Sequence, residues 1–244
     1  MRNKNYLNKK LYSLFFIYFW SLVLNGQNIT PEADINSAYE ESKKQSMQNP
    51  LQEVNIDLEK AYQSEDNTYN RYWFSYGLYN QSLIADGLGD SAAAEQMIDR
   101  AIELLKPLKE DAESQALLAL ELGYSTRFKS YWSMISLGGN AYRCAERAVL
   151  LDPDNLRTNL ALAINDFFTP KIFGGGKKVE SHLKKALQAP ISQVSELVPN
   201  WGKPNVYELL VKYYRKNNKQ AQAQEALKNG LSEFPQNALL LALK

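Results

Sequence analysis

Apolar residues recur every three or four positions along most of the chain, which is the spacing of helices that bury one face. Beyond residue 30, almost no alternating apolar–polar pattern of the kind that strands need is present. The stretch 91–108 is the clearest helical segment, with its apolar face at Ala94, Met97, Ile98, Ala101, Ile102, Leu105 and Leu108. The pattern therefore predicts an all-α protein.

About ten helices are expected, separated by short polar or glycine-containing breaks. Their approximate ranges are 32–47, 50–64, 69–87, 90–108, 111–136, 139–151, 155–168, 176–189, 204–217 and 219–233, with a last short helix from residue 236. Gly89 is expected to end one helix and Asp90 to cap the next. Because most of the breaks are only a few residues long, the helices are expected to pack as antiparallel hairpins.

The expected hairpins also repeat in sequence. The best-matched unit carries large residues on its first helix, at Tyr207, Leu210, Val211 and Tyr214. Its second helix alternates small and large residues before a closing proline, at Ala223, Leu227, Gly230 and Pro235. Small residues let the two helices approach closely, and the proline stops the second one. The second half of the pattern recurs at Ala141, Ala145, Ala148 and Pro153, and again at Ala94, Ile98 and Ala101.

On these residues the chain resembles tetratricopeptide-repeat proteins. The resemblance implies a right-handed solenoid of helical hairpins, about four of them, with the best-matched repeats in 111–240. The N-terminal half departs from the pattern, because helices 69–87 and 111–136 are long and Ala85 stands where a tyrosine is usual.

A glycine-rich stretch, TPKIFGGGKK, allows two interpretations. A phosphate-binding loop needs Ser or Thr after the lysine and a strand before the glycines. Here Lys178 follows Lys177, and the preceding segment is expected to be a helix. The stretch is therefore interpreted as a structural turn, with Phe173 expected to tuck under the hairpin. The turn residues are Pro170, Phe173, Gly174, Gly175 and Gly176.

This turn, the preceding DPDN and the later VPNWGKP together resemble one group of secreted bacterial tetratricopeptide proteins, over residues 111–240. In that group a Thr-Pro…Phe-Gly-Gly loop and a Pro-x-Trp-Gly entry, here containing Trp201 and Gly202, frame the last two hairpins. The group has no established biochemical activity, so the resemblance implies fold and compartment. A more distant likeness is to the periplasmic subunit of some tripartite transporters.

The N-terminus has the features of a secretory signal peptide, in residues 1–26. Four basic residues precede an apolar run from Leu11 to Leu24, and Gly26 offers a small residue at its exit. The run is short for a spanning helix, although an uncleaved membrane anchor is the alternative. The expected mature domain is 27–244, periplasmic or secreted, with no membrane span after cleavage.

Charge and cysteine content exclude some functions. Loss of 1–26 removes four basic residues, so the balance of 28 basic and 27 acidic becomes 24 and 27, about −3. This balance gives no case for nucleic-acid binding. Cys144 is the only cysteine, and His182 the only histidine, so no disulfide and no metal site is expected. No motif for catalysis or for a cofactor is present, and a non-enzyme is expected.

The concave face of such a solenoid is lined by the first helix of each hairpin. It is expected to bind a partner through Tyr76, Tyr79, Arg157, Ile164, Phe167, Phe168, Asn205, Glu208, Lys212 and Arg215. The first hypothesis is an exported scaffold that binds another envelope or secreted protein or peptide there. The alternative is a solute-binding or transport accessory subunit. Self-association is left open, because an uncapped solenoid end can pair with a copy of itself.

Overall fold

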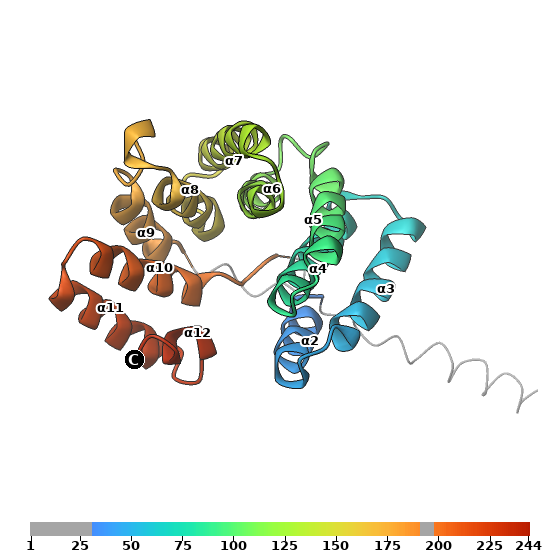
Figure 1. Ribbon diagram of the computed structural model, residues 1–244, viewed down its shortest axis with the longest axis horizontal. Helices are drawn as coiled ribbons and strands as arrows, with labels where there is room; N and C mark the ends of the chain where they lie inside the picture. The colour runs from blue at the N-terminus through green and yellow to red at the C-terminus, as the bar shows by residue number, and fades with distance from the viewer. Residues whose placement is uncertain (1–30, 191–197) are drawn as a thin grey trace, which may run out of the picture.

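The computed structural model describes residues 31–190 and 198–244, and this part of the chain is entirely helical and without strands (Figure 1). The α-helices are α2 (Pro31–Gln45), α3 (Asn49–Ser64), α4 (Thr68–Gly87), α5 (Ser91–Leu105), α6 (Ala112–Ser125), α7 (Tyr131–Leu151), α8 (Leu156–Phe168), α9 (Val179–Gln188), α10 (Lys203–Lys216), α11 (Gln220–Glu233) and α12 (Ala238–Leu241). Two 3₁₀ turns, η1 (Thr126–Phe128) and η2 (Lys171–Phe173), complete it. The expected signal peptide lies outside the described residues.

Consecutive helices pack as hairpins, in the pairs α2/α3, α4/α5, α6/α7, α8/α9 and α10/α11. The described residues thus form five hairpins and a short closing helix, where the sequence indicated about four. The hairpins follow an arc from α2 round to α12, with the first helix of each toward the inside (Figure 1). First helices of neighbouring hairpins also pack on one another, which makes the arc a continuous solenoid. Among the described helices, none has the length and apolarity needed to cross a membrane.

Side-chain caps start several of these helices where the sequence has Asp or Asn. The side chains of Asn67, Asp90, Asp111 and Asn155 each accept a hydrogen bond from a backbone amide of the following first turn. Such a cap stabilises a helix by about 1 kcal/mol. The predicted stop and cap between α4 and α5 are confirmed, since Gly89 has a φ of +86° and Asp90 accepts from the amide of Ala93.

The break between α6 and α7 is not where the sequence indicated. The expected helices 111–136 and 139–151 meet at two glycines, yet Gly138 and Gly139 both lie inside α7. The chain breaks earlier, because Ser125 and Thr126 donate hydroxyl hydrogen bonds to the carbonyls three residues before them and tighten the helix end. Two helical glycines cost only about 1 kcal/mol each, so the longer α7 tolerates them.

The core has three apolar clusters. The first joins α2 to α6, the second joins α8 to α11, and a third, rich in alanine, lies between α6, α7 and α8. One side chain, Trp201, packs against all three clusters, although it belongs to the segment that leads into α10. That segment is therefore a structural part of the inner face.

Candidate functional site

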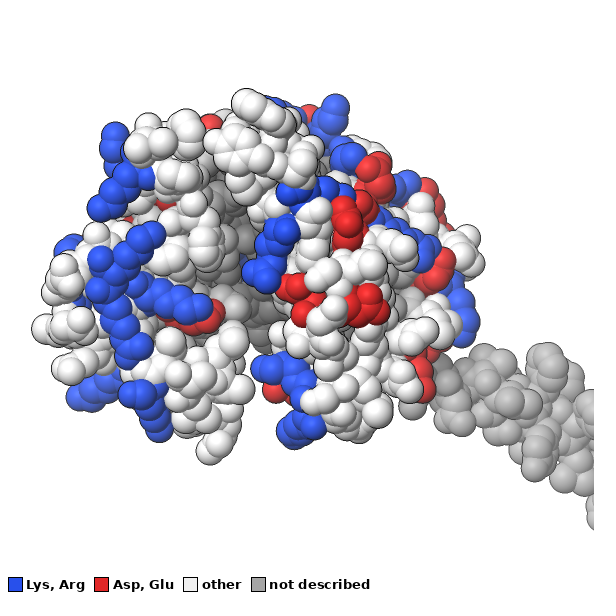
Figure 2. All heavy atoms as spheres, in the orientation of Figure 1, with Lys and Arg blue, Asp and Glu red and all other residues white. Residues whose placement is uncertain are grey.

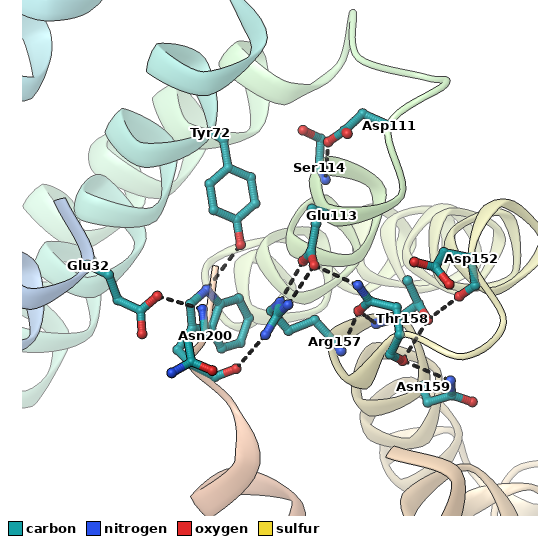
Figure 3. Close-up of polar contacts among 12 residues, drawn as sticks. Glu32, Tyr72, Asp111, Glu113, Ser114, Asp152, Arg157, Thr158, Asn159 and Asn200 are labelled. Carbon is teal, nitrogen blue, oxygen red and sulfur yellow. Dashed lines mark hydrogen bonds and ion pairs between the residues drawn. The ribbon is translucent and has the colours of Figure 1, made fainter. Parts of the chain in front are cut away.

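Residues 198–202, called here the crossing segment, run across the inner face of the arc before α10 begins. The indole of Trp201 stacks on Tyr76 of α4, with ring centroids 5.0 Å apart and planes 15° apart. Its Nε1 donates a hydrogen bond of 3.0 Å to the hydroxyl of Tyr72. The inner face of α4 is therefore covered by a distant part of the same chain (Figure 3).

A buried ion pair holds the carbonyl of the crossing segment. Arg157 of α8 donates from Nε and Nη2 to the two carboxylate oxygens of Glu113 on α6, over 2.6 and 2.7 Å. Its Nη1 donates to the carbonyl of Trp201 over 3.0 Å, and Asn155 adds a bond of 2.7 Å to Glu113. Burial by itself lowers the pKa of Arg157, but the bonds to Glu113 outweigh this and raise it. The guanidinium thus stays charged and fixes the segment.

The start of α2 binds the same segment from the other side. The amide of Asn200 donates to Oε2 of Glu32 over 2.6 Å (Figure 3). Burial raises the pKa of Glu32, and the Asn200 amide and the Arg157 charge only partly offset that effect. The first helix of the arc is thereby tied to the entrance of the last hairpin.

The crossing segment turns into α10 at Gly202, whose φ is +111°. A Cβ there would lie 2.9 Å from Cδ2 of Leu156 and 3.3 Å from Cδ2 of Leu160. Both the backbone conformation and the close approach therefore require glycine. This gives a physical reason for the Trp-Gly pair that the sequence analysis singled out.

The predicted concave-face residues divide into covered and accessible ones. Tyr76 and Arg157 lie on the inner face but are buried beneath the crossing segment. Tyr79 is half-buried and packs edge-on against Tyr124 of α6, with centroids 5.7 Å apart. Ile164 and Phe167 pack partly buried against the second cluster, whereas Phe168 is exposed.

The predicted residues of α10 point in two directions. Lys212 donates a bond of 2.7 Å to Glu208, and Asn205 lies half-buried one turn before that pair. Burial, followed by the charges of Glu40 and Glu208, raises the pKa of Tyr39 on α2. Arg215 instead donates to the carbonyl of Leu243 near the C-terminus over 2.6 Å.

The centre of the arc is hollowed. Figure 2 shows a recess between the half that contains α4 and α5 and the half that contains α8 and α10, with basic and acidic side chains at its edge. The accessible part of the inner face is therefore polar at its margin and lies beside the aromatic residues under the crossing segment.

The turn interpretation of the glycine-rich stretch is confirmed. A helix, α8, precedes it, and Gly174 and Gly176 have φ values of +89° and +85°. A Cβ at Gly175 would meet the carbonyl oxygen of Thr169 at 2.0 Å. The expectation that Phe173 tucks under the hairpin is wrong, because its side chain is 68% exposed.

Three side chains of the site escaped the sequence analysis, namely Glu32, Tyr72 and Glu113. Both carboxylates are in first helical turns, where acidic residues are common because they favour the helix dipole. Nothing in the local sequence distinguishes these two carboxylates from the solvent-exposed acidic residues that are common in first helical turns. A tryptophan in a Pro- and Gly-containing connection was the one available signal, because such a large side chain is seldom left outside a core.

His182 and Cys144 are the only histidine and the only cysteine of the sequence. Nδ1 of His182 lies 2.8 Å from Oδ1 of Asn159, and burial together with Lys185 and Lys178 lowers its pKa. Cys144 is half-buried, and burial raises the pKa of its thiol. Over residues 31–190 and 198–244, no group of three or more His, Cys, Asp or Glu side chains is arranged to hold a metal ion.

Comparison with solved structures identifies the fold. TTC0263, a tetratricopeptide-repeat protein of Thermus thermophilus, superposes with a TM-score of 0.58 at 14% identity, over 87% of this chain and 95% of its own. The fold is that of a tetratricopeptide-repeat protein. HusA, a haemophore of Porphyromonas gingivalis, superposes with a TM-score of 0.52 at 19% identity, over 78% and 96% of the two chains. No protein-family model and no curated protein matches the sequence.

Proposed function

We propose that the chain is an exported, non-enzymatic scaffold that binds an extended segment of another envelope or secreted protein in its concave face. One observation carries the proposal. This face already binds an extended segment, the crossing segment, through contacts of the kind that recognise peptides.

The contacts to the crossing segment involve both side chain and backbone. An aromatic side chain stacks on Tyr76, a carbonyl accepts from Arg157, and an amide donates to Glu32. Backbone contacts of this kind give affinity for extended peptides, and aromatic pockets give selectivity. The tertiary arrangement thus supports recognition of an extended, aromatic-containing partner.

The place for a partner is the part of the face that the crossing segment leaves accessible. It carries the Glu208–Lys212 pair of α10 and, across the recess, Tyr39 of α2. A partner bound here would contact polar side chains at the margin and aromatic ones toward the crossing segment. The export component of the proposal rests on the expected signal peptide, and the near-neutral charge favours a protein over a nucleic acid as partner.

Site-specific photo-crosslinking in the producing cells tests this proposal. A photoreactive phenylalanine analogue replaces Lys212, which is exposed on the inner helix α10, or Asn229, which is exposed on the outer helix α11. We expect one dominant product with an envelope or secreted protein from position 212 and none from position 229. Mass spectrometry of the product then identifies the partner segment.

Equal crosslinking from the two positions would show that the inner face is not selective. The absence of any product from position 212, in a chain with normal helical circular dichroism, would also contradict the proposal. Fractionation of the same cells tests export, since the protein is expected outside the cytoplasm.

The alternative function is solute binding, and haemin is the first solute to test, because HusA, a haemophore, shares the fold. A shift of the Soret absorbance at equimolar haemin, lost when the protein is denatured, would favour this alternative. An unchanged haemin spectrum, together with crosslinking at position 212, would favour the scaffold.

A further inference from the structure

Two parts of the chain, the start of α7 and the segment around η2, expose several large apolar side chains to solvent. Trp132, in the first turn of α7, is 79% exposed, and Ile172, in η2, is 86% exposed. Together with their exposed neighbours they form what is called here the apolar rim, which consists of Tyr131, Trp132, Ile135, Phe168, Ile172 and Phe173. None of the contacts described for the concave face explains it.

Topology brings the two parts of the rim to the same end of two adjacent helices, α7 and α8, from neighbouring hairpins. Helices α7 and α8 are joined by residues 152–155 and pack side by side, so the start of α7 lies at the end of α8. Helix α7 has 21 residues and α8 has 13. The difference of eight residues carries the start of α7 about 12 Å past α8, at 1.5 Å per residue.

The turn that contains η2 is held at this end. The amide of Gly176 donates to the carbonyl of Asp166 over 2.9 Å, and Nζ of Lys178 donates to the hydroxyl of Tyr142 on α7 over 2.8 Å. Figure 1 shows α7 and the turn that follows α8 both at the top of the arc. The rim thus has two projections, the start of α7 and the η2 turn, at the same end of α7 and α8.

The two segments that carry the rim residues contain only basic charges, of which Arg127, Lys129 and Lys178 form ion pairs with acidic side chains of other segments. The segments 126–140 and 167–179, which carry all six rim residues, contain Arg127, Lys129, Lys171, Lys177 and Lys178 and no Asp or Glu. The side chains of Lys171 and Lys177 are exposed and make no ion pair with the described residues. A surface that binds the rim would therefore contact exposed apolar side chains beside two lysines, Lys171 and Lys177, that have no ion pair among the described residues.

We propose that the apolar rim docks the protein on an anionic lipid surface. Trp and Tyr are the side chains enriched at membrane interfaces, and exposed lysines beside them attract anionic headgroups. The rim consists of projections and not of a groove, which suits a fluid bilayer because lipids can pack around tips of unequal height. This binding would be peripheral and does not depend on a partner in the concave face.

Docking on lipid makes a residue-resolved prediction. The protein is purified from the cells that produce it, and the substitution Cys144→Ala removes its native cysteine. A new cysteine is then introduced by Ile172→Cys or, as the matched control, by Asn229→Cys on α11. An environment-sensitive fluorophore is attached to that new cysteine. With vesicles of phosphatidylcholine and phosphatidylglycerol, we expect a blue shift and quenching by spin-labelled lipid at position 172 only. No change at position 172, whatever the total amount of protein bound, would overturn the proposal.

Charge and apolar contributions are separated by variants. Lys171→Gln/Lys177→Gln is expected to weaken binding to the anionic vesicles roughly tenfold or more, from about 1 kcal/mol per basic residue, with little effect on phosphatidylcholine alone. Trp132→Ser is expected to weaken it roughly tenfold. Leu150→Ser, which alters an equally exposed side chain at the other end of α7, is the control and should leave binding unchanged.

Equal effects of the Trp132 and Leu150 substitutions would overturn the proposal, because the rim would not be the contact. A second outcome would also overturn it. If sedimentation shows a dimer without lipid that Trp132→Ser dissociates, the rim contacts another copy of this chain and not a membrane.

Discussion

The same dipeptide, Tyr-Trp, occurs in two helices with opposite fates. In α4, Tyr72 and Trp73 are 4% and 1% exposed, whereas in α7, Tyr131 and Trp132 are 63% and 79% exposed. Within each pair the rings meet edge-on, with centroids 5.1 and 5.4 Å apart. Helix α4 is enclosed by α2, α3, α5 and the crossing segment, but the start of α7 extends past α8. Neighbouring elements, and not residue type, decide which aromatic side chains form the core.

The largest effect is expected from the buried member of this comparison. Trp73→Ala removes a ring that contacts three tyrosines edge-on, namely Tyr69, Tyr72 and Tyr76. We expect the free energy of unfolding to fall by about 3–5 kcal/mol, because the vacated space cannot close fully. Chemical denaturation followed by far-ultraviolet circular dichroism measures this change.

The matched control is Trp132→Ala, at the same place in the second dipeptide. Its free energy of unfolding should change by less than about 0.5 kcal/mol, as for other surface substitutions. A comparable loss of stability in the two variants would contradict the difference in burial described for α4 and α7.

The next effect concerns the ion pair that secures the crossing segment over α4. Arg157→Ala leaves the Glu113 carboxylate largely buried without its cation, which is expected to cost about 3 kcal/mol of unfolding free energy. The same change in Arg147, whose ion pair with Glu110 is exposed, should cost less than about 1 kcal/mol. Equal losses in the two variants would show that Arg157 is no more important than a surface arginine.

The pH dependence of stability tests how well the core around α4 is buried, through the carboxyl of Glu121 on α6, which contacts Ser75 of α4. Burial raises the pKa of Glu121 to about 8; its Oε1 accepts a bond of 2.6 Å from Ser75, while Oε2 has no partner among the described residues. The folded chain therefore retains a proton that the unfolded chain releases near pH 4.3. The contribution of Glu121 to the free energy of unfolding is therefore greatest below about pH 4.3 and is lost as the pH rises through about 8.

Glu121→Gln removes this titration. Between pH 5 and pH 8 we expect the native chain to lose on the order of 3 kcal/mol more unfolding free energy than the variant, at about 1.4 kcal/mol per pH unit. Denaturation curves at the two pH values measure the difference. Identical pH dependence in the two proteins would mean that Glu121 is hydrated in solution.

The smallest effect tests the hydrogen bond of the crossing segment alone. Trp201→Phe retains an aromatic ring over Tyr76 but removes the indole donor to the Tyr72 hydroxyl. A loss of about 1 kcal/mol in unfolding free energy is expected, as for one partly buried hydrogen bond. Trp201→Ala should cost clearly more, and similar values for the two variants would argue against the stacking contact.

Much of the fold could be predicted from the sequence. Apolar spacing indicated the helices, Asp90 and Gly89 indicated a cap and a stop, and the glycines at 174–176 indicated a turn rather than a phosphate loop. The repeat pattern indicated hairpins of the tetratricopeptide type, which the structural comparisons support. The start of α7 was misplaced because glycine is a weaker helix breaker than the hydroxyl hydrogen bonds that end α6.

The candidate site was only partly predictable. Tyr76 and Arg157 were correctly placed on first helices, but nothing local indicated that another part of the chain covers them. Asn200 is 168 residues from Glu32, and Trp201 is 129 residues from Tyr72. Such contacts leave no periodic trace in the sequence, since neither partner lies in the other's helix or hairpin.

The sequence by itself determined the helices, their caps, the glycine turn and the repeating hairpins, because these depend on residues within a few positions of one another. Only the tertiary structure decided that Trp201 crosses the inner face and that Trp132 stays exposed. The physical reason is that burial depends on which helices lie alongside a residue. That in turn depends on how the whole arc closes from α2 to α12.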